Sequence, residues 1–232
     1  MNILVCDDDR EIAKAVGIYL EKEGYNVIMA HDGQEALKAC RKNDIHLILM
    51  DIMMPKLDGI KATMKIREEK NIPIIMLSAK SEDYDKIMGL NVGADDYVTK
   101  PFNPLELVAR VKSQLRRYVH LGTLRQEKTE GRKIYKNGGI IIYDDEKKII
   151  ANGEEISLTP IEYGILRLLL TEPGKVFSME EIYESVWGEK LFNSENTIAV
   201  HIRRIREKIE IDPKEPRYLK VVWGIGYKIE KF

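Results

Sequence analysis

Five polar residues stand directly after apolar runs, and their chemical types could together bind a phosphoryl group. They are Asp7, Asp8, Asp51, Ser78 and Lys100. Crowded carboxylates repel one another unless a cation neutralises them, and an all-oxygen site with open positions suits Mg²⁺. With the cation present, an aspartate can accept a phosphoryl group, because carboxylate nucleophiles form aspartyl phosphates. A lysine and a hydroxyl would then bind the new phosphoryl oxygens.

The acidic run at residues 7–9 has a second interpretation. Aspartate is favoured at helix N-caps and in first turns, so the run could simply start a helix. We prefer this interpretation for Asp9. For the other two members of the run, the coincidence with a third aspartate, a serine and a lysine favours the phosphoryl site.

Short apolar runs alternate with amphipathic stretches through the first half of the chain. The runs are 3–6, 25–30, 46–50, 72–77 and 97–99, and the amphipathic stretches lie near 10–23, 34–42, 58–69, 83–92 and 104–118. This alternation predicts an α/β fold, a five-stranded doubly wound parallel sheet over residues 1–118. Ligands bind such sheets beyond the carboxyl ends of the strands, so the five polar groups should meet at one edge.

The second half changes character after residues 119–135, which lack apolar periodicity and are interpreted as a linker. Short strand candidates then precede two helices that begin at capping boxes, Thr159–Glu162 and Ser178–Glu181. A third helix near 195–210 leads to a hairpin that turns at Gly224–Gly226. These elements predict a small α+β winged-helix domain over residues 136–232.

The composition limits the class of protein. The chain has 37 Lys and Arg against 38 Asp and Glu, so a globally basic nucleic-acid binder is excluded and a DNA site must come from clustering. Two cysteines are too few for a disulfide framework, and no apolar stretch approaches the roughly 20 residues that span a bilayer. The N-terminus shows no signal-peptide pattern. We therefore expect a soluble, cytoplasmic protein with no membrane partner.

One basic cluster lies on the helix predicted near 195–210. Its isoleucines at 198, 202, 205 and 209 form a narrow stripe that should be buried. Side chains opposite the stripe are expected to contact bases, and those on its flanks phosphates. The candidates are Asn196, Val200, Arg203 and Arg204 for bases, and Thr197, His201, Arg206 and Lys208 for phosphates. The alternative is an ordinary amphipathic surface helix.

The first half resembles the receiver domain of two-component response regulators. The matching segments are 3–9, 47–59, 76–79 and 93–102. The resemblance implies Asp51 as phosphoacceptor and a cis peptide between Lys100 and Pro101. It also implies a site for Mg²⁺ or Mn²⁺ built from Asp7 (through water), Asp8, Asp51 and the backbone carbonyl of Met53.

The same resemblance implies a switch and a dimer surface. Ser78 would move to the phosphoryl group, and the ring of Tyr97 would fill the space that it leaves. In the OmpR/PhoB-type subfamily this repacking favours a symmetric dimer through helices four and five. The residues carried over to this surface are Lys86, Asp95, Asp96, Glu106, Arg110 and Arg117. The alternative is a solvated charged face.

Residues 136–232 resemble the winged-helix effector domain of the same subfamily. The matching segments are 158–166, 197–208 and 223–227. The resemblance implies DNA contacts from Trp223, Gly224 and Tyr227. Many members have an arginine that enters the minor groove where this chain has Trp223, which would pack or touch sugars instead. The wing and loop sequences are similar to VanR-type regulators of glycopeptide resistance.

Three other classes of protein fit the sequence less well. A haloacid dehalogenase-type phosphatase would need a second carboxylate two residues after Asp51, where Met53 stands. A flavodoxin-like cofactor binder would need a Gly-rich phosphate loop after the first strand, where this sequence has three aspartates. A regulator that acts unphosphorylated would not need an intact acidic pocket, and here all the pocket residues are present.

We therefore predict a response regulator transcription factor that is not an enzyme, beyond promoting phosphoryl uptake and loss on Asp51. It would control promoters, those of glycopeptide-resistance or cell-envelope genes under the narrower resemblance. The predicted partners are a sensor histidine kinase (VanS-like in that case), promoter DNA, RNA polymerase, and a second copy of the chain when phosphorylated.

Overall fold

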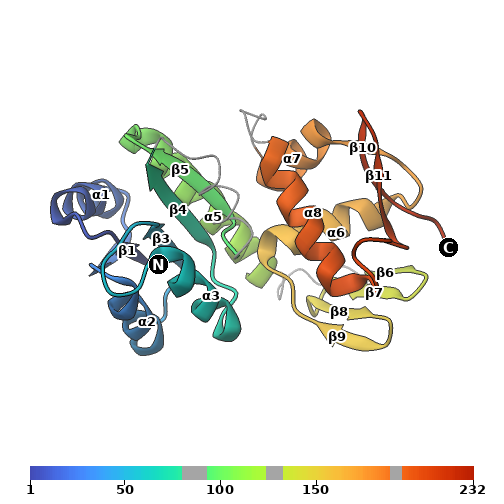
Figure 1. Cartoon of the computed structure of the whole chain (residues 1–232), viewed down its shortest axis with the longest axis horizontal. Coiled ribbons are helices and arrows are strands. Elements are labelled where there is room, and N and C mark those ends of the chain that lie inside the picture. The colour runs from blue at the N-terminus through green and yellow to red at the C-terminus, as the bar shows by residue number, and fades with distance from the viewer. Residues whose placement is uncertain (80–92, 124–132, 189–194) are drawn as a thin grey trace. The chain divides into compact units, whose positions relative to one another are not determined.

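The first unit of the chain is built on a parallel sheet whose central strands are buried on both faces. Its strands are β1 (Asn2–Cys6), β2 (Asn26–Ala30), β3 (Leu47–Asp51), β4 (Ile74–Ala79) and β5 (Asp96–Lys100). They lie in the order β2-β1-β3-β4-β5, and every neighbouring pair is parallel (Figure 1). Strand order reverses between β1 and β3, so their carboxyl ends lie side by side where a ligand site is expected.

Helices cover this sheet. They are α1 (Arg10–Lys22), α2 (Gly33–Lys42), α3 (Gly59–Glu69) and α5 (Pro104–Thr123). The first three begin after an aspartate whose carboxylate accepts one or two backbone N–H groups of the first turn, namely Asp9, Asp32 and Asp58. Apolar side chains of α1 and α5 share one buried cluster with the strands, while α2 and α3 contact each other. The predicted doubly wound α/β fold is confirmed.

The second unit combines two small antiparallel sheets with three helices. One sheet has the order β6-β7-β8-β9, formed by Ile134–Asn137, Ile140–Tyr143, Lys148–Ala151 and Glu154–Ile156. The other has the order β10-β12-β11, formed by Phe177–Ser178, Gly226–Ile229 and Leu219–Val222. The helices are α6 (Pro160–Thr171), α7 (Met179–Trp187) and α8 (Glu195–Ile209), and they share one core with the sheets. This is the predicted winged-helix architecture.

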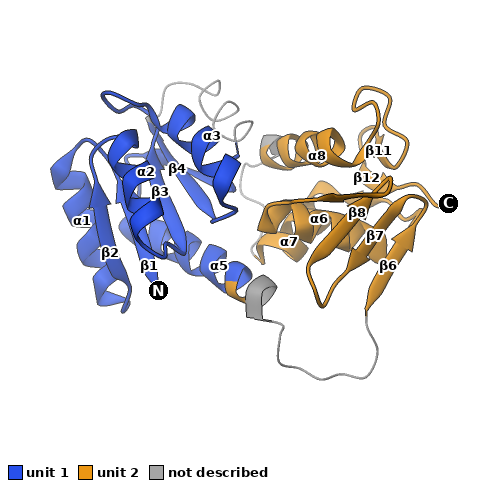
Figure 2. Cartoon of the chain, turned by 90° about the horizontal axis from the view of Figure 1, so that it is seen from below, with its two compact units in different colours: residues 1–118 blue, residues 119–232 orange. Residues whose placement is uncertain are grey.

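The computed structural model describes residues 1–79, 93–123, 133–188 and 195–232. The chain divides into two compact units, Met1–Tyr118 and Val119–Phe232 (Figure 2). The helix predicted near 83–92, with Lys86, lies outside the described residues. Two ends of the predicted linker carry regular structure instead, because α5 continues to Thr123 and β6 begins at Ile134. The boundaries of the functional domains stay a prediction.

Candidate functional site

The carboxyl ends of β1 and β3 bring three aspartates together. One carboxylate oxygen from each of Asp7, Asp8 and Asp51 lies within 4.8 Å of the other two. Asp7 and Asp51 are buried, at 0% and 5% exposed, whereas Asp8 is exposed. Buried carboxylates at this spacing need cationic partners, and an oxygen-only donor set with one exposed member fits a hard divalent cation.

Lys100, the last residue of β5, reaches into this acidic pocket. Its Nζ lies 2.7 Å from Oδ2 of Asp7 and 2.8 Å from Oδ1 of Asp51. Burial raises the pKa of Asp51, the contact with Lys100 opposes that shift, and the charges of Asp7 and Asp8 reinforce it. Burial alone would lower the pKa of Lys100, but its hydrogen bonds to Asp51 and Asp7 leave that pKa raised. Lys100 therefore stays protonated beside the carboxylates. The peptide between Lys100 and Pro101 is cis, as the receiver resemblance implied.

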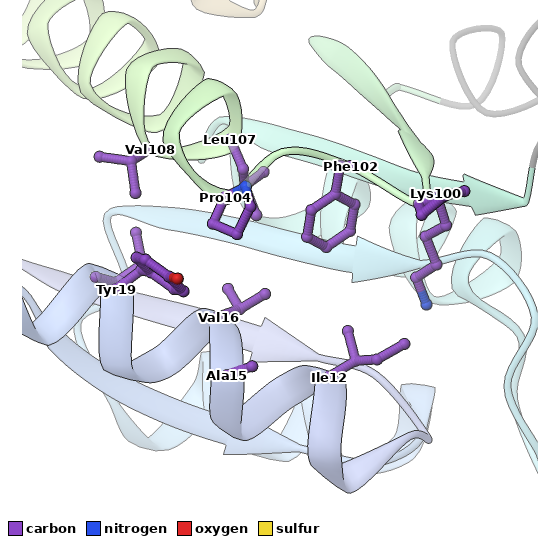
Figure 3. A pocket seen from close by; sticks show the side chains of 11 residues that line it. Ile12, Ala15, Val16, Tyr19, Lys100, Phe102, Pro104, Leu107 and Val108 are labelled. Atoms are coloured by element: carbon purple, nitrogen blue, oxygen red, sulfur yellow. The ribbon is translucent and has the colours of Figure 1, made fainter.

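An apolar pocket of about 400 Å³ adjoins the acidic one and shares Lys100 with it (Figure 3). Ile12, Val16 and Tyr19 of α1 line one side, and Phe102 with residues at the start of α5 lines the other. The methylene stem of Lys100 borders this pocket while its ammonium group binds the aspartates, an arrangement that suits a long amphipathic side chain.

The neighbours of the aspartates have supporting roles. Asp9 accepts the backbone N–H groups of Glu11 and Ile12, so its interpretation as the N-cap of α1 is confirmed. Gly59, which the sequence reasoning left without a role, starts α3 directly against the backbone of Asp51. A Cβ atom at Gly59 would lie 1.9 Å from the carbonyl oxygen of Asp51. Only glycine allows this approach, and the Asp58-Gly59 pair at a helix start was the signal for it.

The predicted switch residues lie on the two strands beside the pocket. Ser78 is 1% exposed, and its hydroxyl has no hydrogen-bond partner among the described residues. On β5, Tyr97 pairs in register with Met76 and is half-buried. A buried hydroxyl without a partner can gain a hydrogen bond when an acceptor arrives, which is the behaviour expected of a switch.

The predicted dimer residues divide into three groups. Arg110 of α5 pairs with Asp96 at 3.1 Å and with Glu106 at 3.0 Å, and it is partly exposed. Arg117 is half-buried and donates to Ser113 Oγ. Asp95 is a correction: it is 0% exposed, and its carboxylate is held by Arg67 of α3 at 2.7 Å. That ion pair keeps the carboxylate of Asp95 buried in the single chain.

The isoleucine stripe of α8 is buried as predicted, with each of its four members at most 1% exposed. A second column on the same helix, about a quarter turn away, is also buried. It contains Thr197, His201 and Arg204, at 1%, 0% and 8% exposed. The ring of His201 packs on Trp187 of α7, with the ring centres 5.6 Å apart. Both α6 and α7 thus pack on α8, so its exposed face is narrower than the isoleucine stripe alone predicts.

This second column corrects the predicted DNA-contacting face. Thr197, Val200 and His201 are at most 8% exposed, and the ring of His201 packs on Trp187 of the same unit. Arg204 does not extend freely, because its Nη2 lies 2.9 Å from the buried carboxylate of Glu162. The same carboxylate binds Lys208 at 2.7 Å. The sequence reasoning recognised Glu162 only as part of a capping box.

Other candidates remain accessible. Arg203 is exposed and pairs with Glu207 along the helix, and Arg206 is half-buried with its Nε donating to the carbonyl oxygen of Leu219 on β11. At the hairpin turn Trp223 is 87% exposed, Gly224 has a φ of 73°, and the side chain of Tyr227 is partly buried against the core. Asn196 belongs to α8, but its side chain lies outside the described part.

Residues 3–112 match the family described as "Response regulator receiver domain", and residues 153–229 match "Transcriptional regulatory protein, C terminal". The chain belongs to the OmpR/PhoB-type response regulators. It is 45% identical over 229 residues to regulatory protein VanRc of Enterococcus gallinarum, covering 99% of this chain and 98% of that protein. Regulatory protein VanR of Enterococcus faecium is 44% identical over 230 residues, with the same coverage. Among solved structures, DrrB, a Thermotoga maritima OmpR/PhoB homolog, matches this chain with 34% sequence identity and a TM-score of 0.50. The match covers 99% of this chain and 98% of the DrrB chain.

This membership makes the chain a response regulator transcription factor, a class that is generally not enzymatic. It also removes the phosphatase and flavodoxin-like alternatives. Across the described ranges, no helix has both the length and the apolar character needed to cross a membrane.

Proposed function

We propose that Asp51 accepts a phosphoryl group from a sensor histidine kinase, and that this modification controls dimerisation and promoter binding. The observation that carries the proposal is the clustering of three carboxylates, two of which, Asp7 and Asp51, contact the ammonium group of Lys100 at 2.7 and 2.8 Å. A helix cap alone would use one aspartate, as Asp9 does. A regulator that acts without phosphorylation would not need this arrangement.

The acidic pocket has the donor set for Mg²⁺ or Mn²⁺. The side chains of Asp7, Asp8 and Asp51 would hold the cation, together with the backbone carbonyl of Met53. When bound, the cation supplies positive charge against the oxygens of the transferred phosphoryl group.

The residues of the chain then have distinct chemical roles. An oxygen of Asp51 attacks phosphorus as the P–N bond of a phosphohistidine breaks, and the bond electrons stay on the imidazole nitrogen, which takes up a proton. Lys100 binds Oδ1 of Asp51, so Oδ2 is the oxygen left for attack. The ammonium group of Lys100 and the hydroxyl of Ser78 donate hydrogen bonds to the phosphoryl oxygens. Tyr97 fills the space that Ser78 leaves.

Acetyl phosphate with Mg²⁺ is expected to add one phosphoryl group to the chain, and peptide mapping should place it on Asp51. Intact-mass spectrometry measures the adduct, with a chelator in place of Mg²⁺ as the control. The same samples should show tighter operator binding. An adduct that forms equally well with the chelator, or that maps elsewhere, contradicts the proposed site.

We also propose that the phosphorylated chain dimerises through α5. Glu106 and Arg110 are partly exposed there, and Leu105 beside them is 70% exposed, an apolar contribution that the charge pattern did not reveal. Lys86, Asp96 and Arg117 complete the proposed surface. Arg110 and Asp96 pair with each other within one chain. On dimerisation this pair would have to break, so that both residues could contact the second chain instead.

Reversing the charge of Arg110 tests this surface. The variant Arg110→Glu would face Asp96 and Glu106 with a like charge, so we expect it to stay monomeric under phosphorylating conditions in sedimentation. The matched control is Lys112→Glu, which lies on the same helix but pairs with Glu23, the residue that follows α1, at 2.7 Å. Dimerisation of the Arg110 variant equal to that of the control would place the dimer surface elsewhere.

For the DNA complex, we propose base and phosphate contacts from α8 and additional contacts from the hairpin. The α8 residues are Asn196, Arg203, Arg204, Arg206 and Lys208, and the hairpin residues are Trp223, Gly224 and Tyr227. We further propose that the chain works in the cytoplasm with RNA polymerase and a VanS-like kinase. From the resemblance of its wing and loop sequences to VanR-type regulators, we propose glycopeptide-resistance or cell-envelope genes as its targets.

A further inference from the structure

Glu162 is a fully buried carboxylate that joins two helices of the second unit. It is the third residue of α6 and closes a capping box, in which its Oε2 accepts the backbone N–H of Thr159 at 2.9 Å. Its Oε1 lies 2.9 Å from Nη2 of Arg204, and its Oε2 lies 2.7 Å from Nζ of Lys208. These two cations stand about one turn apart on α8, so a single carboxylate holds both.

A capping box does not require such cations, as α7 of the same unit demonstrates. There Ser178 and Glu181 form the same reciprocal pair of hydrogen bonds, at 2.7 and 3.0 Å. Glu181 is exposed, and none of the described cations pairs with it. An ionised glutamate buried like Glu162 is costly unless opposite charges accompany it. Burial raises the pKa of Glu162, but Arg204 and Lys208 lower it to a net value below that of a free glutamate.

Arg204 keeps donors that the chain does not use. Nη2 forms an ion pair with Oε1 of Glu162 that does not have hydrogen-bond geometry, whereas Nη1 is buried and has no hydrogen-bond partner within the described residues. The side chain of Arg204 is 10% exposed. Buried N–H groups are normally bonded, so Nη1 can gain a hydrogen bond if an acceptor reaches the part of the Arg204 side chain that is exposed. A guanine edge offers two acceptors in the geometry that an arginine matches.

We infer that Glu162 is a positioning residue for Arg204: it holds one side of the guanidinium so that the remaining N–H groups are presented to a DNA base. The inference rests on the proposed DNA-binding function and adds the residue that sets base preference without touching DNA. A guanidinium that is fixed before binding loses little conformational freedom in the complex. Glu162 also holds Lys208, and thereby the helix that carries both cations.

The test compares Glu162→Gln with Glu181→Gln in the full-length protein. Glutamine serves at the third position of a capping box, so both variants keep their caps, and only the first loses the charge that holds Arg204. The probes are a duplex selected from a random pool by the parent protein, its single-base-pair variants, and a random duplex of equal length. Affinity is measured across salt concentrations, and thermal unfolding is followed in parallel.

For Glu162→Gln we expect roughly tenfold or greater loss on the selected duplex, the scale of one arginine–guanine pair. Binding to random DNA should be unchanged or tighter, because two cations are released from their carboxylate. Preference should relax at the same base pair as in Arg204→Lys, and combining the two changes should add no further loss of preference. Glu181→Gln should behave like the parent.

A merely structural role for Glu162 would lower the melting temperature but leave the ratio of selected to random binding intact, and that result overturns the inference. Tighter binding to the selected duplex also overturns it, since Glu162 would then withhold Arg204. If the parent shows no preference for any duplex, the proposed DNA-binding function fails first. If Arg204→Lys loses preference while Glu162→Gln keeps it, only the positioning role fails.

Discussion

Replacing Asp51 by asparagine is expected to abolish phosphorylation by acetyl phosphate, whereas the same replacement of Asp9 is expected to leave it intact. The amide of asparagine lacks the carboxylate oxygen that must attack phosphorus. Asp9 is exposed and serves as the N-cap of α1, a role that asparagine fills as well as aspartate. The two variants therefore separate the phosphoacceptor from general acidity near the pocket.

Intact-mass spectrometry in the presence of Mg²⁺ checks both variants. A stable phosphoryl adduct on Asp51→Asn would assign the modification to another residue. Thermal unfolding without divalent cations shows whether the carboxylate of Asp51 stabilises or destabilises the folded chain. The pKa of Asp51 is raised in the folded chain, chiefly by burial, so its ionised form costs stability at neutral pH. Asp51→Asn should therefore unfold at the same temperature as the parent or at a higher one.

The clustering of the aspartates and Lys100 could be predicted from the sequence because it follows from the topology of the sheet. In a parallel sheet the carboxyl ends of the strands meet at one edge, so polar residues that end β1, β3 and β5 converge whatever the details of packing. The N-cap role of Asp9 could also be predicted, since capping depends only on the next few residues. No knowledge of distant contacts was needed for either.

The exposed face of α8 could not be predicted equally well, because helical periodicity does not say how many elements pack on a helix. The isoleucines of α8 identified one buried column. The second column is buried by Trp187 and Glu162, which belong to helices that precede α8 in the chain. The burial of Asp95 could not be predicted for the same reason, since its partner Arg67 is 28 residues away in the sequence. A charged residue is predicted to lie on the surface unless the oppositely charged partner that allows its burial is known.

Gly59 shows that a distant contact also constrains the backbone around Asp51. Its Cα lies so near the end of β3 that an added Cβ would meet the carbonyl oxygen of Asp51 at 1.9 Å and Met50 Cγ at 3.1 Å. The amide of Gly59 also donates to the carbonyl oxygen of Ile52 at 2.9 Å. The start of α3 and the end of β3 are thus held in direct backbone contact, and any shift of one moves Asp51.

Gly59→Ala is therefore expected to destabilise the first unit and to slow its phosphorylation. Alanine favours a helix over glycine by about 1 kcal/mol, but the clash is with rigid backbone, and overpacking of this kind costs about 1–3 kcal/mol or more. The matched control is Gly17→Ala in α1, where the nearest atom is Met29 Cε at 2.8 Å, the end of a flexible and 43% exposed side chain. Urea unfolding and the initial rate of labelling by acetyl phosphate compare the two. If Gly59→Ala is as stable and as rapidly phosphorylated as Gly17→Ala, the backbone contact does not constrain Asp51.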